Sequence, residues 1–190
     1  SDQNLSLAAN RSSFDKLTLL PRVLRSVHEG HTRVNLFGHE HRVPVLLAPV
    51  AYHGLVHPDA ELATVQAAVA MQTAMVVSTL ASRRFMDIRR TAEAAAQELQ
   101  RPVPPLWLQL YSQPTRAQTQ AVLQAADEAG FDAIVWTVDA HYKRTAMVLP
   151  VGVSAVNVDA EAQHKHTRQL LDECLVLGSS FTECAPTWAD

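Results

Sequence analysis

The sequence predicts an α/β fold built from a repeating strand–helix unit. Apolar runs typical of buried parallel strands alternate with helix-like segments that carry polar faces. Successive strand-like runs begin at Val43, Ala74, Leu106 and Ala133, roughly thirty residues apart, and an eight-unit (β/α)8 barrel allots about 31 residues to each unit. A doubly wound sheet shows the same alternation, so the spacing alone leaves both architectures open.

The first unit is predicted from a continuous apolar run and the helix-like segment after it. Residues 43–51, VPVLLAPVA, are typical of a strand that is buried on both faces. Residues 57–73, HPDAELATVQAAVAMQT, predict a helix with Pro58 near its first turn. Asp59 and Glu61 would complement the helix dipole at that end.

The next units repeat this pattern. Strands are predicted at 74–81, 106–112 and 133–140, and helices at 85–100 and 115–130. Thr115 suits the N-cap position of the last helix, and Gly130 suits its C-terminal stop.

The segments on either side of these units are less regular. Residues 1–42 predict a short helix and a small hairpin that turns near Gly38. Residues 43–140 hold four βα units, and residues 141–190 predict a long irregular connection with one helix at 164–175. Four units are half of an eight-unit barrel, and a half barrel would leave two apolar strand edges open.

Composition narrows the class of protein. The chain is 47% hydrophobic and 18% charged, with a formal net charge of −3, so it offers no general attraction to nucleic acid or to an anionic membrane. No apolar window is long enough for a membrane span, and the first residues lack the pattern of a signal peptide. Cys174 and Cys184 fit neither a disulfide framework nor a zinc site. We therefore expect a reduced, cytoplasmic setting.

Polar side chains stand where the predicted strands end. In parallel α/β folds these carboxyl ends form the ligand-binding edge, and a buried Gln or Thr needs a hydrogen-bond partner. Hydroxyl, amide and phenol groups suit a planar heterocycle better than hydrolysis, because none is a strong nucleophile without a base. The alternative is that they are only capping and turn residues. The strand-end residues are Pro49, Val50, Ala51, Ser78, Thr79, Gln109, Tyr111, Thr137 and Asp139.

Six fragments of the chain together resemble one family. The sequence is similar to the FMN-dependent 2-hydroxy acid oxidases and dehydrogenases, which include glycolate oxidase, lactate oxidase and mandelate dehydrogenase. The fragments occur in the family's order between residues 5 and 140. They are NRSSFDKLTLLPRVL, LFG, PVLLAPVAYHGLVHPDAELATVQAA, VVSTLAS, LWLQLY and AGFDAIVWTVDA. The stretch APVAYHGLVHP resembles lactate and hydroxymandelate oxidases most.

The resemblance implies a TIM (β/α)8 barrel with FMN over the C-terminal ends of its strands. The backbone of Pro49, Val50 and Ala51 would lie beside the reactive nitrogen of the flavin, and Ala51 would line the substrate pocket. The pyrimidine edge of the ring would be bound by Ser78, Gln109 and Thr137. Tyr111 would donate its hydroxyl to the substrate carboxylate or hydroxyl.

The sequence also departs from the family. After the fourth strand the family has a Gly-x-Arg segment whose arginine binds the substrate carboxylate. Here the stretch reads TVDAHYKRTAMVLP, and Arg144 is the nearest arginine that could pair with a carboxylate. The family's N-terminal tyrosine would precede Ser1. Its flavin-contacting lysine, histidine base with a neighbouring arginine, and glycine-rich phosphate site would all follow Asp190.

The sequence therefore predicts that residues 1–190 are the N-terminal half of a single barrel domain. The resemblance implies oxidation of an L-2-hydroxy acid, lactate-like or mandelate-like, to the 2-oxo acid. A second polypeptide or the C-terminal half would supply the catalytic histidine and the phosphate site, and the assembly would be a homo-oligomer, by resemblance a tetramer. The alternative is a non-catalytic structural or regulatory subunit derived from this family; a different βα-barrel flavoenzyme is a third possibility.

Nine histidines raise the question of a metal site. His39 and His41 flank Glu40 and would share one face of a predicted strand. Zinc requires three or four converging ligands, and a hairpin supplies at most two. We predict no metal site.

Overall fold

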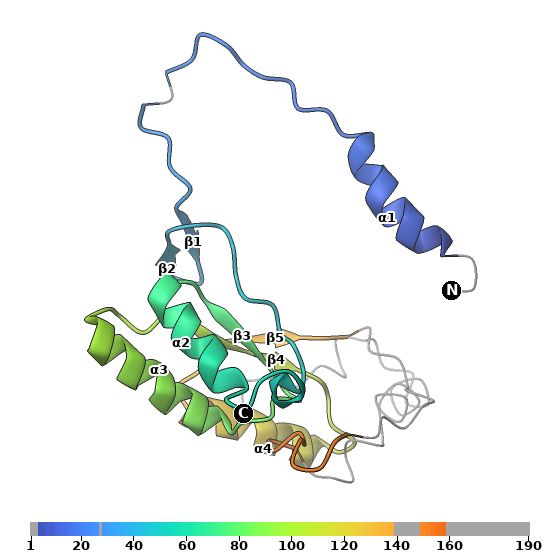
Figure 1. The fold of residues 1–190 in the computed structure, drawn as a ribbon, viewed down its shortest axis with the longest axis vertical. Coiled ribbons are helices and arrows are strands. Elements are labelled where there is room, and N and C mark those ends of the chain that lie inside the picture. Colours follow the sequence, from blue (N-terminus) through green and yellow to red (C-terminus); the bar gives the residue numbers. More distant parts are fainter. Residues whose placement is uncertain (1–3, 27, 139–148, 159–190) are drawn as a thin grey trace. The chain divides into compact units, whose positions relative to one another are not determined.

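A three-stranded parallel sheet is the centre of the computed structural model, which describes residues 4–26, 28–138 and 149–158 (Figure 1). The strands are β3 (Met75–Ser78), β4 (Leu106–Leu110) and β5 (Ala133–Trp136), in the order β3-β4-β5. Val77 pairs with Leu108, and Leu108 pairs with Ile134. The described residues show a parallel α/β sheet, and within them it does not close into a barrel.

Three helices alternate with the strands. They are α2 (Glu61–Met71), α3 (Phe85–Leu99) and α4 (Arg116–Glu128). The helix and strand positions predicted from Ala74 to Trp136 are confirmed to within a few residues at each end. The prediction of Thr115 as N-cap is also confirmed, since its side chain accepts from the Gln118 N–H in a capping box. Gly130 follows α4 with a φ of 69°, a left-handed conformation that ends the helix.

The helices and one face of the sheet enclose the hydrophobic core. Leu106, Leu108 and Leu110 alternate along β4 toward the helices, where they meet Val65 of α2 and Ile88 of α3. The intervening residues of β4 therefore project to the opposite face. In a barrel that opposite face is the interior.

The predicted strand at 43–51 is wrong in extent and in burial. Among the described residues its only ladder contact is a bridge from Leu47 to Met75, made by two backbone hydrogen bonds of 3.0 and 2.9 Å. Val45 and Val50 are exposed. Pro44 and Pro49 have no N–H to donate, and no described strand borders the segment on its other side, so the ladder is short.

The predicted hairpin is confirmed as β1 (Val34–Leu36) and β2 (His39–His41), which pair antiparallel around Phe37 and Gly38. Its side chains pack on Trp107 of β4: the Phe37 ring lies 5.2 Å from the Trp107 ring, edge to face, and the buried His41 ring lies 6.3 Å away. The hairpin therefore covers the N-terminal end of the sheet. The candidate site lies at the other end.

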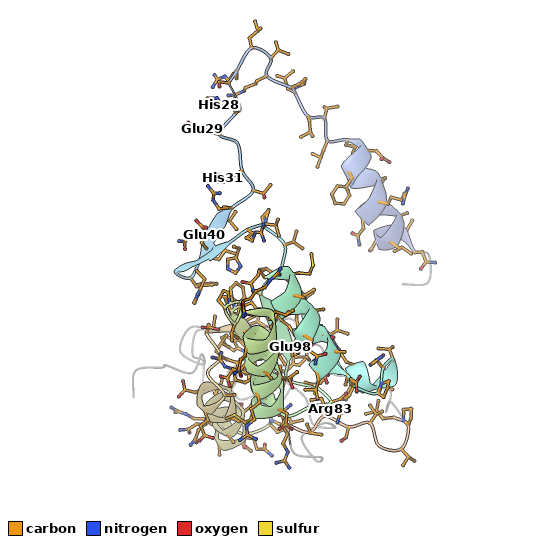
Figure 2. All side chains as sticks on the ribbon, turned by 60° about the vertical axis from the view of Figure 1, so that its left-hand side comes forward. His28, Glu29, His31, Glu40, Arg83 and Glu98 are labelled. Carbon is orange, nitrogen blue, oxygen red and sulfur yellow. The ribbon has the colours of Figure 1, made fainter. Side chains whose placement is uncertain are left out.

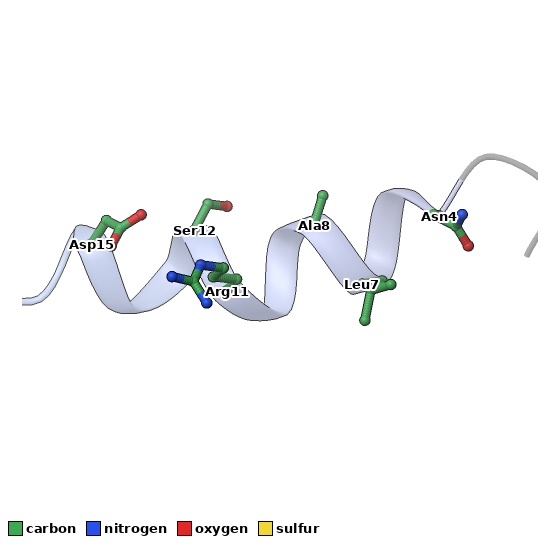
Figure 3. Close-up of a pocket in the computed structure, with 6 residues that line it drawn as sticks. All are labelled: Asn4, Leu7, Ala8, Arg11, Ser12 and Asp15. Carbon is green, nitrogen blue, oxygen red and sulfur yellow. The ribbon is translucent and has the colours of Figure 1, made fainter.

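Residues 1–31 form a separate unit, whose described part contains helix α1 (Leu5–Asp15), the short helix predicted from the sequence. No residue of α1 is buried. A shallow hollow along this helix is lined by its own side chains and by its N-cap (Figure 3), namely Asn4, Leu7, Ala8, Arg11, Ser12 and Asp15. A hollow on a single helix brings no second element to a ligand, so we do not assign the functional site there.

Within the part of the chain that is described, no helix combines the length and the apolar character needed to cross a membrane. The helix predicted at 164–175 lies outside the described residues.

Candidate active site

Three polar side chains form a hydrogen-bonded row across the C-terminal ends of the parallel strands. Ser78 Oγ donates to Gln109 Oε1 at 3.3 Å, and Gln109 Nε2 donates to Thr137 Oγ1 at 2.8 Å. The row forms because Ser78 pairs with Gln109 in register, and because Gln109 projects away from the helix-facing leucines. The structure thus brings together three residues that the sequence predicted separately.

Gln109 is the centre of this row and is only 3% exposed. Its Oε1 also accepts from the Thr79 backbone N–H at 3.4 Å, so both ends of the amide have partners. A buried amide without partners would cost about 1–3 kcal/mol. These partners hold the side chain in one orientation.

Thr79, the residue after β3, continues the hydrogen bonding to β4 beyond the end of β3. Its hydroxyl donates to the Gln109 carbonyl oxygen at 2.5 Å and accepts from the Tyr111 N–H at 3.1 Å. Thr79 is fully buried. It therefore positions the backbone of both Gln109 and Tyr111, a role that the sequence did not reveal.

Tyr111 is half-buried beyond the end of β4, on the same face as Gln109 by strand alternation. Its carbonyl accepts from Gln113 Nε2 at 2.8 Å, and the Gln113 N–H donates to Thr119 Oγ1 of α4 at 2.9 Å. Gln113 and Thr119 are buried polar residues that the sequence analysis missed. Through Gln113, the loop from β4 to α4 is thus attached to the helix two residues after Tyr111.

The segment Pro49–Ala51 leads into a turn beside the end of β3. The Tyr52 N–H donates to the Leu80 carbonyl at 3.1 Å, directly after Ala51. Tyr52 is buried, and this burial raises the pKa of its hydroxyl above the usual 10.0. Pro49 and Val50 are exposed, and Ala51 is half-buried.

Two predicted site residues, Asp139 and Arg144, lie outside the described residues. The histidines of the hairpin have other contacts: His41 is buried against Trp107, and His39 Nε2 lies 3.6 Å from Asp132 Oδ1. Figure 2 marks Glu40 on the same hairpin and Arg83 before α3. No group of three potential metal ligands converges anywhere in the described ranges.

The row suits the donor and acceptor pattern of a flavin pyrimidine edge, which presents carbonyl, N–H and carbonyl in sequence. The hydroxyls of Ser78 and Thr137 can turn to donate to carbonyl oxygens, and the amide of Gln109 offers an acceptor and a second N–H. All three come from strand ends and not from long loops, so little order would be lost on binding.

The chain is similar to known proteins along almost its whole length. Residues 1–181 match the family model described as FMN-dependent dehydrogenase. An L-lactate oxidase of Alicycliphilus denitrificans is 37% identical over 97% of this chain, and a 4-hydroxymandelate oxidase of Amycolatopsis orientalis is 32% identical over 96% of it. The match spans 50% of each relative. The chain therefore belongs to the FMN-dependent dehydrogenase family, whose cofactor is FMN.

Solved structures agree with this assignment. A mandelate oxidase studied with (S)-mandelic acid superposes with a TM-score of 0.71 at 27% identity, covering 93% of this chain and 50% of that one. A second mandelate oxidase structure gives 0.68 at 32% identity, covering 84% and 45%. The chain spans about half the length of the relatives and structures that it matches. The resemblance stated from the sequence is confirmed.

Proposed function

We propose that this chain is the N-terminal half of an FMN-dependent enzyme that oxidises an L-2-hydroxy acid, lactate-like or mandelate-like, to the 2-oxo acid. The observation that carries the proposal is the row Ser78–Gln109–Thr137, which is held by hydrogen bonds at the ligand-binding edge of the sheet. The family membership makes FMN the ligand to test against that row.

Each predicted residue has a place in this proposal. Ser78, Gln109 and Thr137 bind the pyrimidine edge and orient the ring. The backbone of Pro49–Ala51 lies along the reactive side of the ring, and the small side chain of Ala51 leaves room for substrate.

Tyr111 and Arg144 act on the substrate in this proposal. The Tyr111 hydroxyl donates a hydrogen bond to the substrate carboxylate or hydroxyl, which orients the reacting C–H bond. Arg144 pairs with the carboxylate. Bound FMN supplies the redox chemistry by accepting the hydride equivalent from the substrate. The base that removes the hydroxyl proton belongs to the half of the barrel outside this chain.

The proposed whole is a TIM barrel. Ile134 and Val135 of β5 are partly exposed at one edge of the described sheet, and Val45 is exposed at the other. Apolar edges of this kind are covered in folded proteins, and four further βα units would cover both. We propose that these units come from the C-terminal half of the same gene product or from a second chain, and that the completed barrels form a homo-oligomer.

The test is FMN binding by the full-length protein, meaning this chain together with the proposed C-terminal half or second chain. Apoprotein is titrated with FMN while the flavin fluorescence is recorded, in the wild type and in Gln109→Met. Saturable binding by the wild type that weakens about tenfold or more in the variant supports the proposal, since Gln109 holds the centre of the row. Absence of FMN binding by the folded full-length protein contradicts it and favours a non-catalytic subunit.

A further inference from the structure

We propose that Glu61 is a positioning residue for the flavin site: its carboxyl group holds the loop that carries Pro49–Ala51 against the end of β3. The inference rests on the proposed function, because it concerns the loop that would line the reactive side of the ring. Independently of any flavin, the buried oxygen Glu61 Oε1 joins the loop after the first-strand segment to the loop after β3.

The hydrogen bonds of Glu61 define this role. Oε1 accepts from the His53 N–H at 3.2 Å and from the Ser82 N–H at 2.8 Å. His53 belongs to the loop after the first-strand segment, and Ser82 belongs to the loop after β3. The Glu61 side chain is 1% exposed, far more buried than a dipole-complementing carboxylate at a helix N-terminus needs to be.

Further contacts join the same two loops around Glu61. The Tyr52 N–H donates to the Leu80 carbonyl at 3.1 Å, and the Gly54 N–H donates to Ser82 Oγ at 3.1 Å. A Cβ on Gly54 would lie 3.1 Å from that oxygen, so the loops are in close approach. Glu61, at the start of α2, accepts from Ser82 and from His53, the residue before Gly54.

One more contact joins the first loop to α2, and another joins the loop after β3 to the segment just before α2. His53 Nδ1 lies 3.0 Å from Thr64 Oγ1, one turn along α2 from Glu61. Arg83 Nη2, from the loop after β3, donates to the Pro58 carbonyl just before α2. The arrangement therefore links α2 and both loops, with Glu61 Oε1 as the acceptor common to the two loops.

The backbone on both sides of this arrangement is strained. Tyr52 has a φ of 55° and Ala60 has a φ of 53° with a ψ of −130°, conformations that are unfavourable for residues other than glycine. Such strain persists only where surrounding contacts impose it. Tyr52 directly follows Ala51, and Ala60 directly precedes Glu61, so the strain lies at the two ends of the segment that Glu61 holds.

The sheet itself cannot hold this loop. The first-strand segment pairs with β3 only through Leu47, two residues before Pro49. Beyond that bridge, the position of Pro49–Ala51 depends on the Tyr52–Leu80 bond and on the contacts to Glu61. Loss of Glu61 Oε1 should let the loop that carries Pro49–Ala51 move away from the end of β3, where the flavin would bind, without disrupting the core.

The experiment compares Glu61→Met with Glu61→Gln in the full-length protein. Methionine keeps the length of the side chain and removes both acceptors, whereas glutamine keeps one carbonyl acceptor. Exposed Glu98 on α3 supplies the control Glu98→Gln. Amide hydrogen exchange is measured on the flavin-free protein, and FMN affinity is measured by fluorescence titration.

We expect exchange at the amides of His53 and Ser82 to rise by about tenfold or more in Glu61→Met, while the amides of β4 keep their protection. FMN should bind about tenfold more weakly to Glu61→Met, whereas Glu61→Gln and Glu98→Gln should stay within about threefold of wild type. Rescue by glutamine distinguishes a positioning acceptor from a general loss of stability.

Two results would overturn the inference: wild-type exchange at both amides in Glu61→Met, or equal damage by Glu61→Gln and Glu61→Met. If Glu61→Met does not fold, Glu61→Asp tests the same contact, because it keeps a carboxyl group but shortens the side chain by one methylene group and so withdraws the acceptor from the His53 and Ser82 amides. Faster exchange at these two amides and weaker FMN binding then support the inference, and no change in either contradicts it. Hydrogen exchange is measured without flavin, so it tests the anchoring of the loops independently of the proposed function. If the wild type does not bind FMN, the proposed function and the link to flavin are rejected, whereas the exchange result for the loops still holds.

Discussion

Gln109 decides whether the strand ends form a binding site. A single amide contacts Ser78, Thr79 and Thr137, so its removal affects the ends of both β3 and β5. We expect Gln109→Met to weaken FMN binding by about tenfold or more and to lower the free energy of unfolding by about 1–3 kcal/mol, because buried donors lose their partner. Fluorescence titration and urea unfolding measure the two effects. The exposed Gln120→Met on α4 is the control and should change neither.

Tyr52, in the loop beside the site, makes the stability of the folded protein depend on pH. Burial raises the pKa of its hydroxyl above 10.0, so the folded state holds this proton more tightly than the unfolded state does. Its contribution to stability is therefore complete below pH 10.0 and is lost as the pH rises through the folded pKa. Urea unfolding between about pH 8 and about pH 11 should show a shallower decline for Tyr52→Phe than for wild type. Equal slopes would show that Tyr52 titrates as it does in the unfolded chain.

At the scale of the residue, sequence pattern reveals polar side chains only where they interrupt an apolar run. Gln109 and Thr137 stand out in this way. Thr79 is recognisable from the sequence only as one of several strand-end residues, and Glu61 only as a first-turn carboxylate, because the burial of both depends on contacts from distant segments. The sequence predicts only that Glu61 complements the dipole of its helix, whereas its hydrogen bonds in the structure are to two loops.

The start of α2 carries a backbone conformation that suits glycine. Ala60 has a φ of 53° and a ψ of −130°, and replacing it with glycine removes the Cβ that makes this region unfavourable. We expect Ala60→Gly to raise the free energy of unfolding by up to about 1 kcal/mol, measured by urea unfolding. The control Ala67→Gly lies at an exposed interior position of the same helix and should lower it by about 1 kcal/mol. Equal destabilisation by both would contradict the strain at Ala60.

The capping box holds the start of α4, the helix that follows the Tyr111 loop. Thr115 Oγ1 accepts from the Gln118 N–H at 3.2 Å, and Gln118 Oε1 accepts from the Thr115 N–H at 3.2 Å. Thr115→Ala should lower the free energy of unfolding by about 1 kcal/mol, and Thr115→Ser should stay close to wild type. Thermal and urea unfolding test this. Loss of stability in the serine variant as large as in alanine would show that the methyl group and not the hydroxyl matters.

At the scale of the element, local sequence predicted the helices and strands from Ala74 to Trp136 because each has its own period and end signals. Thr115 and Gly130 are such signals. The segment 43–51 has the composition of a buried strand, but the length of a strand depends on a neighbour at each side. Only β3 borders it in the described part of the chain, and it pairs there through Leu47 alone.

At the scale of the whole molecule, the described sheet has apolar side chains at both edges and binding groups at its C-terminal end. Ile134 and Val135 lie at one edge and Val45 at the other. The row Ser78–Gln109–Thr137 supplies the ring-binding groups of the proposed flavin site, while the base and the phosphate site of the proposed enzyme would come from outside this chain. In the proposed enzyme the described sheet supplies one half of the site, and its two apolar edges are where the other half would attach.

The measurement that tests the central claim most directly is anaerobic reduction of the purified full-length protein. We predict that it carries FMN and that addition of L-lactate or (S)-mandelate bleaches the visible absorbance of the oxidised flavin. The variant Gln109→Met should carry less flavin under the same conditions. Full-length protein that folds but neither retains nor takes up FMN, or that carries FMN which no L-2-hydroxy acid bleaches, would contradict the account.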